Sequence, residues 1–137
     1  MNDDAREEAE RFRWIESEKA GYDLGEAAIQ QWVARHWPAF VRGRALAHLT
    51  GRRFWLSMPR EDFGALSRQF PHDRELIDEV TARLVDGADN LTLIQWAADT
   101  NRPLDRVCDI LQRIDLNALR QRFPPPDDAD PPHIVQG

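Results

Sequence analysis

Apolar residues recur three and four positions apart along most of the chain, and glycine or proline interrupts this spacing at short intervals. The segment 76–84 shows the pattern well, with Leu76, Ile77, Val80 and Leu84 on one helical face. A period near 3.6 is typical of an α-helix with one buried face, whereas a strand alternates every second residue. The spacing therefore predicts an all-α fold, a compact array of about seven or eight short helices.

Signals for helix starts and ends divide the chain further. A first helix is expected to end near Gly21, since glycine readily adopts the left-handed conformation that stops a helix. Asp23 and Glu26 have the spacing of a capping box that opens a second helix. Pro38 is expected to close or kink that helix, because proline lacks the amide hydrogen that an inner turn needs. The remaining expected elements are helices over 39–49, 63–70, 76–84, 91–98, 104–114 and 116–123, and an extended connector over 53–57.

The composition changes at Pro124. Residues 124–132 hold five prolines and three aspartates, which bars regular helix or sheet and provides no core. We therefore expect a single helical domain over 1–123 and a disordered tail over 124–137. The tail is either a solvated end or a proline-rich ligand for another protein.

The sequence contains neither a recognisable membrane span nor a secretory signal. Residues 1–13 are rich in charge, whereas a secretory signal needs an apolar run. No apolar stretch approaches the roughly 20 residues that cross a bilayer. Cys108 is the single cysteine, so no intramolecular disulfide is expected. These features predict a cytoplasmic protein with no membrane partner.

Residues suited to catalysis or metal binding do not occur in recognisable patterns. His36, His48, His72 and His133 are scattered, and Cys108 has no second cysteine beside it, whereas a zinc site needs closely spaced pairs. No glycine-rich phosphate loop occurs, and no serine or cysteine nucleophile has a motif around it. We therefore expect no metal, no cofactor and no catalytic residues, and hence a protein that is not an enzyme.

Positive charge gathers in one part of the chain. Residues 21–60 carry six basic against two acidic groups, and residues 61–100 carry three basic against nine acidic groups. The basic groups either pair with the acidic helix around Asp73 to Glu79 or remain open to an anionic partner. A net charge of −6 weakens attraction to nucleic acid, so an acidic protein surface is the favoured partner.

Aromatic residues interleave with these arginines, and arginine beside an aromatic ring is typical of protein-binding surfaces. We therefore expect a small non-catalytic adaptor or regulator that binds an acidic protein surface. A second copy of the chain is one such partner, because the basic and acidic parts suit each other in a homodimer. The expected partner-binding residues are Arg35, Arg42, Arg44, Arg52, Arg53 and Trp55.

The five tryptophans fall into two groups. Trp32 belongs to an apolar stripe and is assigned to the core, and Trp96 is assigned to a helix junction. Trp14, Trp37 and Trp55 each adjoin arginine or histidine at or near a helix end or connector. Each of these three is either a core residue or an interface anchor.

Residues 93–113 resemble a helix-turn-helix in spacing. An alanine lies in the first helix, a polar turn follows at 100–102, and branched residues take the packing positions of the second helix. The segment departs from that motif at Asn101, where a glycine is usual. Asp105 and Asp109 on the second helix would face phosphate oxygens in DNA. Nucleic-acid binding through this segment is the alternative function.

Overall fold

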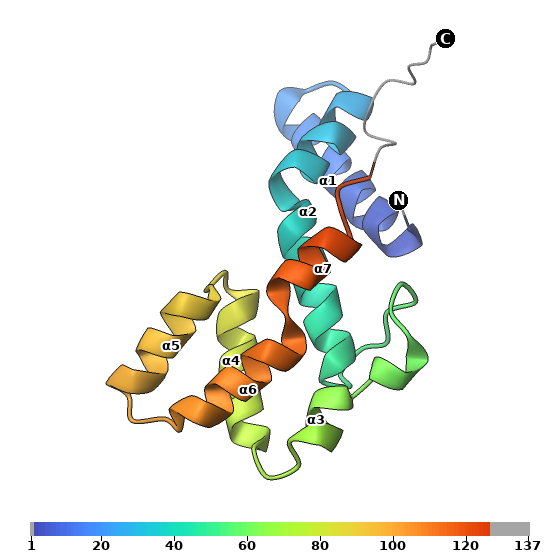
Figure 1. Ribbon diagram of the computed structural model, residues 1–137. Helices are drawn as coiled ribbons and strands as arrows, with labels where there is room; N and C mark the ends of the chain where they lie inside the picture. The colour runs from blue at the N-terminus through green and yellow to red at the C-terminus, as the bar shows by residue number, and fades with distance from the viewer. Residues whose placement is uncertain (1, 127–137) are drawn as a thin grey trace. The chain divides into compact units, whose positions relative to one another are not determined.

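The structure, a computed structural model, describes residues 2–126, and every regular element in that range is a helix (Figure 1). The all-α prediction is therefore confirmed, and residues 53–57 form a non-helical connector. From residue 127 on, the expected Pro/Asp-rich tail lies outside the described residues. Within the described range, no helix combines the length and the apolar character that a membrane span requires. The elements are α1 (Asp3–Ala20), α2 (Glu26–Leu49), η1 (Arg60–Asp62), α3 (Ala65–Gln69), α4 (Arg74–Val85), α5 (Asn90–Asp99), α6 (Leu104–Ile114) and α7 (Leu116–Arg122).

The described residues divide into two compact units, where the sequence interpretation expected one domain over 1–123. Unit 1 contains residues 2–40 and 124–126, and unit 2 contains residues 41–123. The boundary falls inside α2, just after Pro38. Helix α2 therefore contributes its first part to unit 1 and its last part to unit 2.

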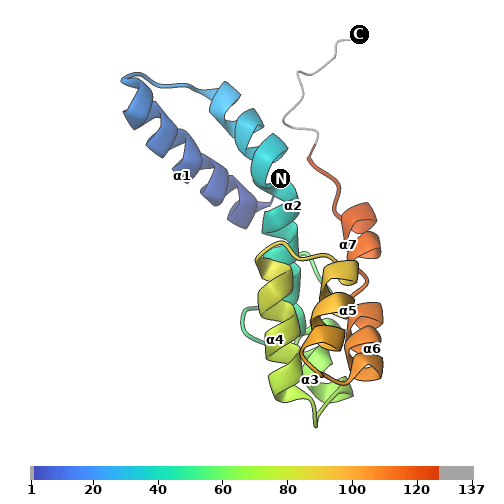
Figure 2. The same cartoon turned by 90° about the vertical axis from the view of Figure 1, so that its left-hand side faces the viewer.

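Unit 1 is built on α1 and the first part of α2, which lie side by side (Figure 2). The Asn2 side chain caps α1 by accepting the Ala5 N–H at 2.8 Å. The helix stops at Gly21, which has a φ of 83°, as the sequence predicts. The Phe12 ring meets the His36 ring edge-on with a centroid distance of 5.5 Å. This contact joins the facing sides of the two helices.

Helix α2 differs from the prediction at both of its signals. The capping box is wrong, because α2 begins only at Glu26 and the Asp23 carboxylate accepts the Gly25 N–H at 2.9 Å. Of the two outcomes expected at Pro38, the helix end, with a separate helix over 39–49, is wrong as well, since one helix runs through to Leu49, and the kink stays a prediction. The fixed φ of proline is compatible with a helix. Pro38 therefore removes one hydrogen bond without ending the element.

Helices α4, α5 and α6 lie side by side in unit 2 (Figures 1 and 2). Each contributes a fully buried apolar side chain, namely Leu84 from α4, Leu93 from α5 and Ile110 from α6. Burial of one such side chain contributes about 1.5–3 kcal/mol to stability. The three helices therefore share one buried centre, and α3 packs against α4 beside it.

Candidate functional site

His48, near the end of α2, holds the connector loop, which we define as residues 50–64. Its imidazole is fully buried. Nδ1 accepts a hydrogen bond of 3.0 Å from the Trp55 N–H, so Nε2 carries the proton and donates to the Pro59 carbonyl oxygen at 2.8 Å. The rings of Phe54 and Phe63 meet the imidazole edge-on at 4.7 and 5.3 Å. One side chain thus ties the middle of the loop to α2.

Backbone hydrogen bonds fix both ends of the connector loop. The N–H groups of Arg52 and Arg53 donate to the Ala47 carbonyl oxygen at 2.9 and 3.2 Å, and the Gly64 N–H donates to the His48 carbonyl oxygen at 2.8 Å. Gly51 has a φ of +78°, and a Cβ atom there would lie 3.3 Å from the Gly64 Cα. Glycine at position 51 therefore allows the two ends of the loop to approach each other.

A tight turn at the middle of the loop exposes one leucine. The Met58 N–H donates to the Trp55 carbonyl oxygen at 3.0 Å, which closes the turn. Both residues that form this bond are buried, and the Trp55 ring lies 4.8 Å from the Phe123 ring. Leu56 follows Trp55 directly and is 91 % exposed. The turn is thus anchored by two buried side chains and presents an apolar tip.

The six residues expected to bind a partner belong to two units and differ in their exposure. Trp55 is only 2 % exposed, contrary to the expectation of a partner contact, because the turn folds its ring against Phe123. Arg35 is an exposed residue of unit 1, and the other four arginines belong to unit 2. Arg44 is half-buried on α2. Of the six, Trp55 is therefore the one that lies inside the fold.

Arg42 of α2 binds backbone carbonyl groups at the end of α4. Its guanidinium donates to the Leu84 carbonyl oxygen at 3.1 Å and to the Ala88 carbonyl oxygen at 3.0 Å, at the end of α4. Burial lowers the pKa of Arg42 from its ordinary value, and an arginine stays charged despite such a shift. A cation at this place satisfies carbonyl groups that the last turn of a helix leaves without partners. Arg42 therefore joins α2 to α4.

Three arginines of the connector loop lie on the surface: Arg52, Arg53 and Arg60. Arg52 pairs with Asp78 of α4 at 2.8 Å, and both side chains are more than half exposed. A pair this exposed holds the two groups only weakly. Arg60 has no ion-pair partner within residues 2–126. The expected pairing with the acidic helix is thus realised for Arg52, and Arg53 and Arg60 lie on the surface of the same loop.

One residue in the turn of the helix-turn-helix-like segment adopts the conformation that glycine usually takes in that motif. Asn101 has a φ of 58°, so it adopts the left-handed conformation for which glycine is usual. On α6, Arg106 pairs with Asp73 at 2.7 Å. The neighbouring exposed groups of α6 include Asp105 and Asp109. Asp73 therefore already neutralises Arg106, a basic group that could otherwise contact DNA phosphates.

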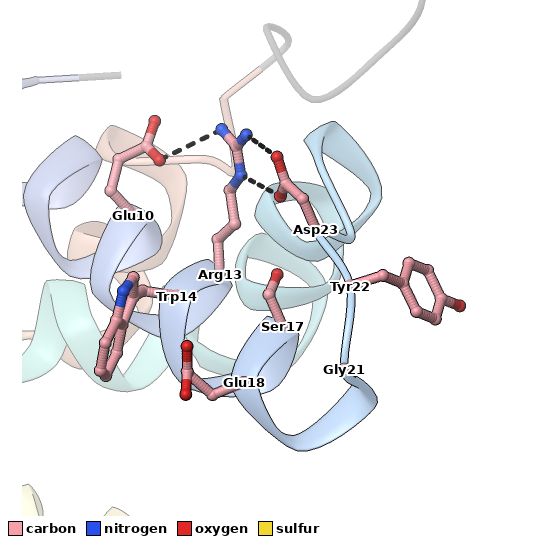
Figure 3. A pocket seen from close by; sticks show the side chains of 8 residues that line it. All are labelled: Glu10, Arg13, Trp14, Ser17, Glu18, Gly21, Tyr22 and Asp23. Atoms are coloured by element: carbon pink, nitrogen blue, oxygen red, sulfur yellow. Dashed lines mark hydrogen bonds and ion pairs between the residues drawn. The ribbon is translucent and has the colours of Figure 1, made fainter.

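A shallow hollow of about 750 Å³ lies in unit 1, along α1 and the turn that follows it (Figure 3). Trp14 is 66 % exposed at one end, and Tyr22 points outward at the other. Trp14 is the one of the three undecided tryptophans that is exposed, since Trp37 and Trp55 are buried. The residues that line the hollow, called the unit 1 groove below, are Glu10, Arg13, Trp14, Ser17, Glu18, Gly21, Tyr22 and Asp23.

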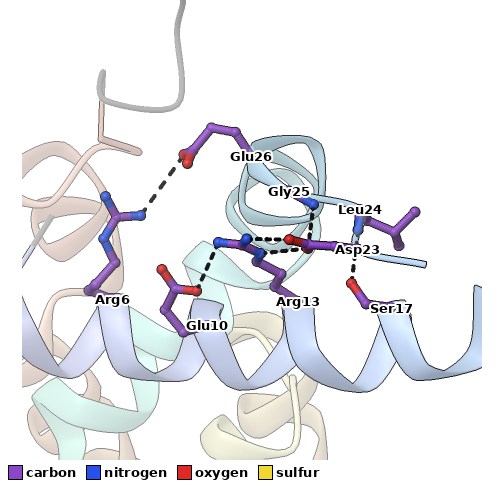
Figure 4. A network of polar contacts seen from close by, with 8 residues as sticks. All are labelled: Arg6, Glu10, Arg13, Ser17, Asp23, Leu24, Gly25 and Glu26. Atoms are coloured by element: carbon purple, nitrogen blue, oxygen red, sulfur yellow. Dashed lines mark hydrogen bonds and ion pairs between the residues drawn. The ribbon is translucent and has the colours of Figure 1, made fainter. Parts of the chain in front are cut away.

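Hydrogen bonds order the floor of the unit 1 groove (Figure 4). Arg13 donates through Nε and Nη2 to the two Asp23 carboxylate oxygens, at 3.0 and 2.7 Å. These bonds, with the Gly25 N–H, lower the pKa of Asp23 to about 2. The Ser17 hydroxyl accepts the Leu24 N–H at 2.9 Å. The turn between α1 and α2 is therefore held in place by polar contacts with α1.

No group of three or more histidine, cysteine, aspartate or glutamate side chains among residues 2–126 is placed to hold a metal ion. Comparison of the chain with protein-family models finds no match, and comparisons with curated proteins and with solved structures find none either. The functional argument therefore depends on the geometry of the chain itself.

Proposed function

We propose that this chain is a non-catalytic, cytoplasmic protein-interaction module that binds an acidic protein surface through its connector loop. The observation that carries the proposal is the exposure of Leu56, 91 %, at the tip of a turn anchored by buried residues. Tips of turns usually carry glycine, proline, asparagine, aspartate or serine. A leucine held there in water supports a role in contact with another apolar surface.

The charge around Leu56 supports an acidic partner. Residues 50–60 contain three arginines and no acidic residue. A guanidinium presents planar, paired donors that match a carboxylate, so arginines beside an apolar tip give both register and specificity. The proposed contact residues are Arg52, Arg53, Leu56 and Arg60. Trp55, which the sequence favours, supports the turn from inside.

The rigidity of the loop supports binding without a large entropic cost. His48 bonds the backbone at Trp55 and at Pro59, and further backbone bonds hold the loop ends. Ordering a flexible loop on binding costs free energy that a pre-organised loop does not lose. The turn therefore presents Leu56 in one arrangement before any partner arrives.

Selection of binders from a library of random displayed peptides tests this function. We expect the selected peptides to combine acidic and apolar residues and to bind the wild-type protein with an affinity that falls as salt is raised. Leu56→Glu should weaken their binding at least tenfold. Leu91→Glu is the matched control, because Leu91 is a 74 % exposed leucine on α5. Selected peptides that bind both variants equally well would overturn the proposal.

The conformation of Asn101 favours nucleic-acid binding through α5 and α6 as a second candidate function. Binding to generic duplex DNA in a gel-shift titration, with a steep loss of affinity between low and moderate salt, would support it. The exposed acids of α6 and the Arg106–Asp73 pair weigh against it. We therefore rank this function below protein binding.

A further inference from the structure

Two aromatic side chains that line the unit 1 groove, Trp14 and Tyr22, are largely exposed. Glu10, Trp14 and Glu18 are four residues apart and share one face of α1. Trp14 is 66 % exposed, and Tyr22 is 68 % exposed. Figure 3 shows Arg13 and Ser17 between these two rings.

The charges of the unit 1 groove favour a cationic occupant. Arg13 is the one cation in the lining, and its guanidinium is engaged by Asp23 and, at 3.4 Å, by Glu10. Glu18 has no ion-pair partner within residues 2–126. With Glu10, Glu18 and Asp23 against Arg13, the lining carries three acids and one base. A guanidinium that entered would also stack on the exposed face of Trp14.

We propose that the occupant of this groove is the connector loop of a second copy of this chain. The loop offers the cations that the groove lacks, since residues 50–64 carry three arginines against Glu61 and Asp62, and Asp62 already pairs with Arg113 at 3.4 Å. Leu56 supplies an apolar tip for the Trp14 ring, and Arg53 and Arg60 lie near it in sequence to meet the groove carboxylates. This inference rests on the proposed function and names the partner of that loop.

The contact joins two different surfaces, because the loop of one copy meets the groove of another. Two copies can make the contact twice in a reciprocal two-fold pair, and more copies can make it head to tail in an open series or a closed ring. Both contributing surfaces carry charge, so the association weakens as salt rises.

Sedimentation velocity of two blocked variants, alone and mixed, tests the proposal. The loop-blocked variant is Arg53→Glu with Leu56→Glu, and the groove-blocked variant is Trp14→Glu with Glu18→Arg. We expect the wild type to associate with rising concentration and each variant alone to remain a monomer. An equimolar mixture should give a 1:1 dimer that grows no further, because only one intact loop and one intact groove can meet.

Circular dichroism checks that each variant keeps its helical content, which we expect because the substituted positions are exposed. The control Leu91→Glu should associate like the wild type. A wild type that stays monomeric at every concentration overturns the inference, and if acidic peptides still bind the loop, the proposed function stands. Association that the loop-blocked variant retains contradicts the inference, whereas acidic peptides that bind this variant as well as the wild type contradict the proposed function. A mixture that forms no dimer, although the wild type associates, contradicts the groove as receptor.

Discussion

The imidazole of His48 and the backbone amide of Trp55 form a hydrogen bond of 3.0 Å that ties the end of α2 to the exposed turn of the connector loop. The same ring donates to the Pro59 carbonyl oxygen on the far side of the turn. Because the bond from the Trp55 N–H is buried, loss of the ring leaves that amide without a partner. The display of Leu56 therefore depends on a residue that no partner touches.

Replacement of His48 by phenylalanine should destabilise the protein by roughly 2–4 kcal/mol, because the ring volume stays while a backbone donor and acceptor lose their partner. Urea denaturation measures the loss, and amide hydrogen exchange at Trp55 should accelerate. The control is His72→Phe at an exposed position, which should change stability by less than about 0.5 kcal/mol. Equal effects of the two substitutions would show that the His48 bonds do not hold the loop.

Replacement of Arg42 by methionine should cost about 2–3 kcal/mol, because two carbonyl oxygens at the end of α4 lose a charged donor. Arg42→Lys should lose less stability than Arg42→Met, because the positive charge remains. It should still be less stable than the wild type, because an ammonium lacks the spread of donors of a guanidinium. Thermal or urea unfolding measures both variants. Arg35→Met is the control at an exposed arginine, and an equally large loss there would contradict the structural assignment of Arg42.

The ion pair of Arg13 and Asp23 should make the stability of the protein depend on pH in the acidic range. The folded-state pKa of Asp23, about 2, lies below its ordinary value of 3.8. The stabilisation by the carboxylate is therefore complete above that ordinary value and is lost as the pH falls toward the folded-state pKa. Titration of the Asp23 carboxyl carbon by NMR should report the low pKa.

Removing the guanidinium at position 13 tests the cause of that shift. Arg13→Gln should raise the pKa of Asp23 toward its ordinary value, whereas Arg11→Gln should leave it low, because Arg11 pairs with Glu8. A wild-type Asp23 that titrates at its ordinary pKa would contradict the bidentate contact.

The backbone at position 101 should tolerate glycine better than a β-branched residue. Its φ of 58° suits glycine and asparagine, whereas a β-branched side chain is strained there. Asn101→Gly should leave stability within about 0.5 kcal/mol of the wild type, and Asn101→Val should lower it by about 1–2 kcal/mol. Urea denaturation of the two variants measures the difference. Equal stability would mean that the turn between α5 and α6 has a different backbone conformation.

The helical fold was predictable because local signals determine most helix ends. Gly21 stops α1 where the sequence places a stop, and the period of three and four residues marks the later helices. The continuity of α2 was not predictable from Pro38 alone. Whether proline ends a helix depends on the packing of the residues on both sides, which local rules do not contain.

The candidate sites were predictable only in part. Trp55 adjoins arginine and suggests a surface anchor, but the bond from its amide to His48 brings it inside, and no local pattern reports that bond. Leu56 has no periodic neighbours, so only the turn geometry identifies it as exposed. Trp14 did leave a signal, since it lies off the face of α1 that carries the buried Ala5 and Ala9. That signal could have assigned Trp14 to the surface.

Binding through the connector loop is tested by the footprint of a selected acidic peptide on the isotopically labelled wild-type protein, measured by NMR of the backbone amides. Shift changes should centre on Arg52 to Arg60 and should be lost in Leu56→Glu but not in Leu91→Glu. A footprint on α6, or one that Leu56→Glu leaves unchanged, would contradict the assignment of the connector loop as the binding surface.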